Sequence, residues 1–183
     1  MAYTTIKNPG LYFNTKLWTG TGANLSITGV GFQPDFTWIK NRANTDDHNL
    51  FDVLRGFSTD ALLRSNTNGA ATDTTEGIKS FDSDGFSLGT NGSSNGNGQG
   101  MVSWNWKAET AFSNNAGANG ATIASSGKVN TTAGFSIVSF VGNQTSGATV
   151  AHGLGAVPKV VIIKGRDSAL DWRSYFAPLG AGK

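Results

Sequence analysis

The sequence predicts an all-β protein, folded as an antiparallel β-sandwich of jelly-roll type. Apolar residues alternate with polar ones far more often than they recur at helical spacing, as in strands that bury one face. Clusters of Gly, Asn, Ser and Thr interrupt these stretches after about ten residues each. Many short strands at such spacing are typical of sandwiches and jelly rolls.

Residues 101–108 give the clearest strand. Val102, Trp104 and Trp106 alternate there with polar residues, so we expect the two tryptophans on the face that packs in the core. The same reasoning predicts strands, in chain order, near 11–18, 24–29, 35–41, 49–55, 60–65, 77–82, 85–89, 120–125, 134–141, 147–152, 158–164 and 171–176. Ser83, Asp84 and Gly85 predict a hairpin turn, with the glycine at positive φ.

An internal repeat is the most informative feature of the chain. The run GVGFQPDFTWIKNR at 29–42 recurs as GLGAVPKVVIIKGR at 153–166, an offset of 124 residues (153 minus 29). Each copy combines a Gly-x-Gly bend, a proline that begins a strand, the apolar strand itself and a Lys-x-Arg exit. We therefore expect 13–56 and 135–180 to superimpose, with Pro34 and Pro158 at equivalent strand starts.

The repeat divides the chain into three parts. Residues 1–108 form a first β-sandwich module, and 135–183 form an incomplete second module. Between them, 109–134 is rich in Ala, Asn, Gly, Ser and Thr, which predicts a linker with at most one strand. Val160 to Ile163 are four successive apolar residues, so we expect both faces of that strand to require cover. The cover would come from the first module, a neighbouring subunit or sequence outside this chain, which predicts a multi-copy assembly.

Composition excludes several classes of function. The 14 Lys and Arg exceed the 12 Asp and Glu by only two charges, too few for nucleic-acid binding. Cysteine is absent, which excludes disulfides and thiolate chemistry. No stretch reaches the roughly 18 apolar residues of a membrane span, and the first residues do not resemble a signal peptide. We expect a soluble protein, made in a cytoplasm, with no membrane partner.

Several segments resemble a known family. YFNTKLWTGTG, SITGVGFQPDFTWIKNR, LFDVLRG, SFDSDGFSLG and MVSWNWKA, in this order, resemble a repeated β-sandwich domain of tailed-phage virion proteins, usually labelled tail fibre or concanavalin-like. The later GFSIVSFVG, ATVAHGLGAVPKVVIIKGRD and WRSYFAPLGAGK resemble the start of its second repeat. The resemblance implies a virion structural protein made in the host cytoplasm, in a tail fibre, spike or other surface appendage, and brings no catalytic residues with it.

The resemblance also implies partners. These are other virion proteins and copies of the chain itself, with a trimer favoured, and host surface polysaccharide is a further candidate. A capsid decoration protein and a lectin-like glycan-binding adhesin module are the alternatives.

The acidic residues and histidines do not predict an enzyme. Glu76 and Glu109 are the only glutamates, and neither lies in a paired-carboxylate strand motif. Asp46, Asp47 and His48 are adjacent in sequence, so a solvated loop is the simpler interpretation, and His152 has no partner that spacing can assign. We expect no enzymatic activity and no cofactor.

The remaining candidate sites are weak. Asp82 and Asp84 imitate the start of a calcium loop, but its closing glutamate is missing, and a plain hairpin turn is favoured. Trp172 is the tryptophan best placed for exposure to a sugar ring. Two basic pairs at the strand exits are candidates for an acidic polysaccharide, with solvated strand ends as the simpler interpretation: Lys40, Arg42, Lys164 and Arg166.

Overall fold

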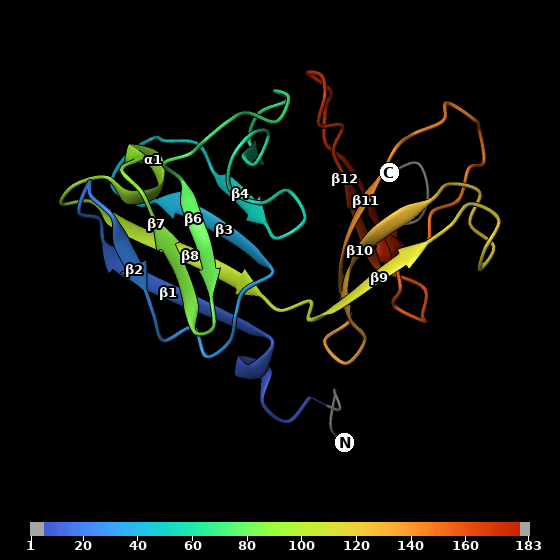
Figure 1. Cartoon of the computed structure of the whole chain (residues 1–183), viewed down its shortest axis with the longest axis horizontal. Coiled ribbons are helices and arrows are strands. Elements are labelled where there is room, and N and C mark those ends of the chain that lie inside the picture. Colours follow the sequence, from blue (N-terminus) through green and yellow to red (C-terminus); the bar gives the residue numbers. More distant parts are fainter. Residues whose placement is uncertain (1–5, 180–183) are drawn as a thin grey trace.

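The computed structural model describes residues 6–179 and confirms the all-β fold (Figure 1). The strands form four sheets, and within the described residues neighbouring strands of each sheet run antiparallel. Helix is confined in this part of the chain to α1 (Gly92–Asn95) and the 3-10 turns η1 (Pro9–Leu11) and η2 (Ala177–Leu179). No helix in the same part is long and apolar enough to cross a membrane.

The first module is a sandwich of two sheets. The larger has the order β1-β8-β3-β4-β5, with β1 (Phe13–Thr19), β8 (Gly100–Trp106), β3 (Phe36–Asn41), β4 (Asn49–Asp52) and β5 (Leu63–Arg64). The smaller has the order β2-β7-β6, with β2 (Leu25–Ile27), β7 (Gly85–Leu88) and β6 (Ile78–Asp82). Ile39, Phe51 and Met101 from the larger sheet share one buried cluster with Phe86 and Leu88 from the smaller.

The orientation of β8 corrects one expectation. Its inner face carries Met101, Ser103 and Asn105, which are all fully buried, whereas Trp104 and Trp106 are half-buried on the outer face. The buried polar groups are satisfied, because Asn105 donates to Ser103 Oγ and to the carbonyl of Asn14, and its own oxygen accepts from a threonine hydroxyl. The polar face can therefore enter the sandwich, and the tryptophans are left for a second contact.

The second module repeats the hairpin of the first. Strands β12 (Val160–Ile163) and β13 (Arg173–Phe176) pair Val160 with Phe176. Strands β3 and β4 pair Phe36 with Asp52, the same positions less 124. Pro34 and Pro158 each lie two positions before their strand. The repeat is thus confirmed for the register of this hairpin, and the superposition of 13–56 on 135–180 stays a prediction; Gly180 lies outside the described residues.

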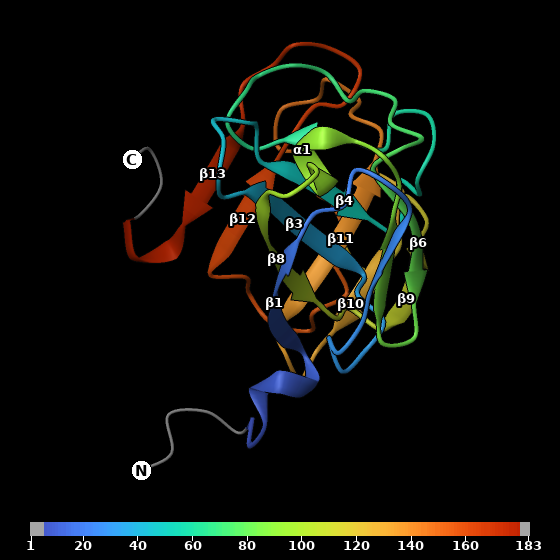
Figure 2. The ribbon, with the colours of Figure 1, turned by 90° about the vertical axis from the view of Figure 1, so that its left-hand side faces the viewer.

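The prediction that 109–134 is a linker with at most one strand is wrong. This segment contains β9 (Thr110–Asn114) and β10 (Ser125–Asn130), which extend β11 (Phe135–Phe140) into a three-stranded sheet of order β11-β10-β9. Small residues make this possible: a Cβ at Gly127 would lie 2.1 Å from the carbonyl oxygen of Ile137. The strand expected at 120–125 begins only at its last residue, and that at 147–152 is a single bridge from Val150 to Ile123. Figure 2 shows the sheet of β9, β10 and β11 behind the first module.

Candidate functional site

An aromatic cluster joins the two modules. On the outer face of the large sheet, Trp106 lies between Phe13 and Phe36, with ring centroids 4.9 and 5.3 Å away. Phe135 of β11 stacks on Trp106 at 6.0 Å and 23° and also meets Phe36 at 6.2 Å. Aromatic pairs at such distances add to the energy of simple burial. The tryptophan face of β8 is therefore a contact surface for the second module.

On the same outer face of the large sheet, Trp38 contacts His48. Trp38 packs edge-on against Trp104, and its indole Nε1 donates to Nδ1 of His48 at 2.9 Å. Burial lowers the pKa of His48, the positive charge of Lys40 lowers it further, and Asp47 opposes both. The lowered pKa favours the neutral imidazole, in which Nδ1 can accept a hydrogen bond, and this hydrogen bond positions Trp38.

A partly buried ion pair ties the intermodule strands to the first module. One carboxylate oxygen of Asp35 accepts from the ammonium of Lys128 at 2.6 Å. The other accepts the backbone amides of Ala108 and Glu109, at 2.8 and 2.7 Å. Asp35 thereby binds both the chain that follows β8 and strand β10.

Trp172 is placed differently from the expectation of exposure. It is half-buried, and its indole Nε1 donates to the carbonyls of Arg64 and Thr67, both at 3.0 Å. Its ring packs against Leu50 and Leu63 of the first module. This tryptophan is a contact between the modules, because the first module offers it an apolar cluster of Leu50, Leu63 and Ala71 and two carbonyl acceptors.

The four basic residues do not form an exposed patch. Lys40 donates to the carbonyls of Asn41 and Asn44, and Lys164 donates to those of Gly165 and Asn68. Arg166 is half-buried, and its carbonyl accepts the amide of Ala71. Arg42 alone of the four is exposed. Lys40 and Lys164, which are equivalent in the repeat, thus each bind backbone carbonyls at the end of their strand.

Asp84 belongs to a hairpin turn, as the sequence favoured. Its two carboxylate oxygens accept the amides of Gly31 at 2.6 Å and Gly29 at 2.8 Å. These hydrogen bonds, with a smaller contribution from Lys16, lower the pKa of Asp84. Asp82 accepts from Ser80 Oγ at 2.8 Å. Within residues 6–179, no group of three or more acidic or histidine side chains could hold a metal ion.

The other carboxylates also support loops. The amide of Thr90, followed by Lys79 and the Thr90 hydroxyl, lowers the pKa of Glu76 by hydrogen bonding to it. Glu109 pairs with Lys107 at 3.0 Å. Asp47 accepts from Asn66 and pairs with Arg64, while its neighbour Asp46 accepts from Asn41. Each of these groups already bonds to the local chain.

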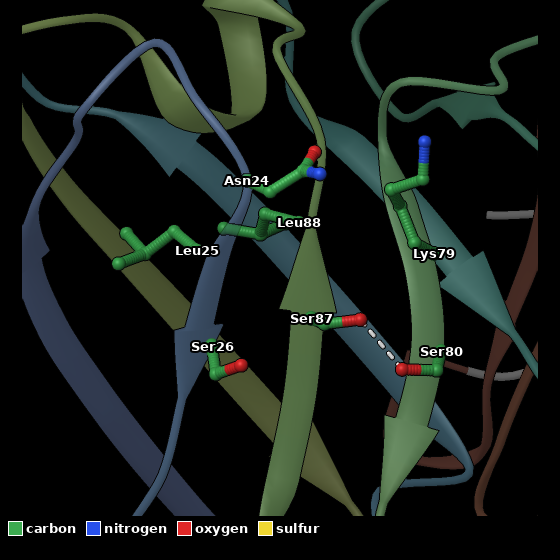
Figure 3. A pocket seen from close by; sticks show the side chains of 7 residues that line it. All are labelled: Asn24, Leu25, Ser26, Lys79, Ser80, Ser87 and Leu88. Carbon is green, nitrogen blue, oxygen red and sulfur yellow. Dashed lines mark hydrogen bonds between the residues drawn. The ribbon is translucent and has the colours of Figure 1, made fainter.

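Shallow hollows lie on the described surface, and two of them border the sheets discussed above. Figure 3 shows the first, on the outer face of β2-β7-β6, where the hydroxyls of Ser80 and Ser87 lie 2.5 Å apart and Lys79 and Leu88 also line the hollow. The second lies beside the second Gly-x-Gly bend, and its lining includes Gly153, Gly155, Pro158 and, from β9, Phe112 and Asn114. The second hollow adjoins the surface described next.

The hairpin β12-β13 presents an apolar surface to solvent. Val160 is 49% exposed and Ile162 60%, and every residue of β13 is exposed. The first module therefore does not provide the cover that the strand 160–163 requires. Exposed apolar patches of this kind mark contact sites. This surface is the strongest candidate for a functional site in the described chain.

A family model described as a domain of unknown function, DUF7483, matches residues 8–183. The chain belongs to this family. No curated protein and no solved structure matches it.

Sequence reasoning missed Asp35, Lys128 and Phe135 as the residues that join the modules. One signal was present for Asp35: the repeat has Lys159 at the equivalent position, so a carboxylate is specific to the first copy. Lys128 and Phe135 lie in or beside the segment expected to be a linker. Nothing in their spacing predicts which surface they contact.

Proposed function

We propose that this chain is a structural protein of a tailed-phage virion, in a tail fibre, spike or other surface appendage, where it works in several copies beside other virion proteins. The observation that carries the proposal is the apolar surface of β12-β13, which the chain leaves uncovered. A neighbour in a symmetric appendage would bury it. The resemblance of the strand segments to virion domains supports the same assignment.

The chemistry of the described residues supports an assembly role more than a catalytic one. The glutamates and the aspartates of the 46–47 and 82–84 turns bond to neighbouring backbone and side chains. The glycan-binding alternative depended on Trp172, which donates its indole N–H to the first module instead. Arg42 is the basic candidate still exposed.

Locating the chain in intact particles by cryo-electron microscopy, with a gold-labelled antibody as a second method, tests the proposal. We expect density in an appendage, with three copies around an axis. Density on the capsid surface would favour the decoration protein, and absence from the particle would overturn the proposal. Binding to a glycan array that is lost in Arg42→Ala would favour the lectin-like module.

A further inference from the structure

The two Gly-x-Gly bends have the same backbone conformation at their glycines. Gly29 and Gly31 have φ of 77° and 87°, and Gly153 and Gly155 have φ of 74° and 68°. Glycine adopts this left-handed region without strain. Backbone amides in such bends form concavities that bind anions.

The first bend binds a carboxylate within the chain. The amide of Gly29 donates to Oδ2 of Asp84 at 2.8 Å, and the amide of Gly31 donates to Oδ1 at 2.6 Å. Each carboxylate oxygen therefore has an amide of its own. The amide between them, that of Val30, donates to the main-chain carbonyl of Asp84 at 3.1 Å. One aspartate thus accepts all three amides of this bend.

The second bend uses its central amide differently. The amide of Leu154 donates to Nδ1 of His152, at 3.2 Å, and this histidine stands where the first copy has Thr28. The second bend therefore needs no main-chain carbonyl from another segment. Within the described part of the chain, the amides of Gly153 and Gly155 have no acceptor. The open amides are the two that hold the carboxylate oxygens in the first copy.

The two free glycines line a shallow hollow, whose volume of about 620 Å³ is within the range of small-molecule sites. The half-buried ring of Phe112 provides an apolar wall. Ser113 and Asn119, both exposed, add a hydroxyl and an amide oxygen. Among the described residues no lysine or arginine lines this hollow. A singly charged carboxylate is therefore favoured over phosphate or sulfate, which protein sites hold chiefly with those side chains.

His152 adds a third donor to the hollow. Because its Nδ1 accepts the amide of Leu154, the neutral imidazole carries its proton on Nε2. The same residue lines the hollow. Two amides, an imidazole N–H and an aromatic ring together suit a ligand that has a carboxylate, hydroxyl groups and a ring with an apolar face.

We propose that the Gly153–Gly155 bend is a binding site for a sugar acid of the uronic-acid class. The two amides bind the two oxygens of the carboxylate, as their equivalents bind Asp84, and the sugar ring packs against Phe112. Ser113 and Asn119 receive the ring hydroxyls. The inference depends neither on the virion assignment nor on what covers the exposed face of β12-β13.

The test is a titration of the full, isotope-labelled chain with galacturonate, followed by the amide resonances in nuclear magnetic resonance spectra. We expect the resonances of Gly153 and Gly155 to move and to saturate. Those of Gly29 and Gly31, whose amides already bind Asp84, should stay in place and provide a control within each spectrum. Galactose, which lacks the carboxylate, should leave all four unchanged. Unchanged resonances of Gly153 and Gly155 at the highest galacturonate concentration would overturn the site.

Variants of Ala156 test the charge of the ligand without altering the bend, because this residue is exposed and lines the hollow. Ala156→Lys should strengthen galacturonate binding and Ala156→Glu should weaken it, each by about threefold, since an added surface charge contributes modestly. Ala156→Gln is the control of matched size and should bind as the wild type does. Equal affinities of the lysine and glutamate variants would overturn the placement of the carboxylate at this bend.

Three other ligands or conditions test the class of ligand. Acetate that binds as tightly as galacturonate would overturn the role of the sugar ring, and inorganic phosphate that binds more tightly would overturn the preference for a carboxylate. Movement of the Gly153 and Gly155 resonances with protein concentration alone would overturn the small-molecule assignment, because a side chain of a second copy would then supply the carboxylate. The location of the chain in particles tests the proposed virion role separately.

Discussion

Lys128 and Asp35 form an ion pair at 2.6 Å that joins β10 to the entrance of β3. Asp35 is 2% exposed, and the amides of Ala108 and Glu109 bind its second oxygen. A charge in this position needs its partners, because a buried carboxylate without them is costly. The pair therefore fixes where the intermodule strands leave the first module.

Replacing Lys128 with Gln should lower the free energy of unfolding by about 1–3 kcal/mol, because a hydrogen bond to a buried charge is lost. Chemical denaturation measures the change. Lys107→Gln is the matched control, since Lys107 pairs with the half-exposed Glu109, and its cost should stay below about 1 kcal/mol. Equal effects of the two variants would contradict the structural importance of the Asp35 pair.

Phe135→Ala should separate the modules more than it unfolds either one. The ring stacks on Trp106 and meets Phe36, so its loss should cost about 2 kcal/mol and expose the tryptophan. The measurements are thermal unfolding and a red shift of tryptophan fluorescence. Phe140→Ala, at the exposed end of β11, provides the control and should leave the fluorescence unchanged.

His48 should make stability depend on pH. Its folded pKa lies below the ordinary value of 6.5, so the unfolded chain binds the proton more readily. The contribution is complete above about pH 6.5 and is lost as the pH falls through the folded pKa. His48→Gln keeps an acceptor for Trp38 and cannot titrate. Melting temperatures between about pH 7.5 and 5, on either side of the ordinary histidine pKa, should fall less in this variant; parallel curves would contradict the assignment.

Asp84 should contribute a second acid-sensitive step. Its pKa is lowered from 3.8 by the amides of Gly31 and Gly29, so its stabilising contribution is present above that value and is lost as the pH falls through the folded pKa. Asp84→Asn should be less stable than wild type at neutral pH and should lose less stability on acidification. Asp82→Asn is the comparison, because Asp82 accepts only from Ser80 among the described residues. If Asp82→Asn changed the acid dependence of stability more than Asp84→Asn, the assignment of this step to Asp84 would be wrong.

Local features were predictable from the sequence. Alternation in 101–108 predicted a strand, and the Ser83 to Gly85 turn predicted the β6-β7 hairpin, since both depend on neighbouring residues. The repeated glycines and prolines predicted two hairpins of equal register. Those residues restrict the backbone wherever they occur, so the same local geometry forms in both copies.

Contacts between distant segments were decided only by the tertiary structure. Alternation assigns Trp104 and Trp106 to one face of β8 but does not say what covers that face. In the structure Asn105 and its hydrogen-bond partners lie in the sandwich interior, and Phe135 packs on the tryptophan face. Of the strands in 109–134, β10 forms on an edge of β11, and β9 forms on the other edge of β10. Ile39 and Ile163 are equivalent in sequence, and only the packing of the β6-β7 hairpin on the first copy makes one buried and the other exposed. The burial of a side chain depends on which distant segments pack on it, whereas the register of a hairpin depends on the residues of its own strands and turn.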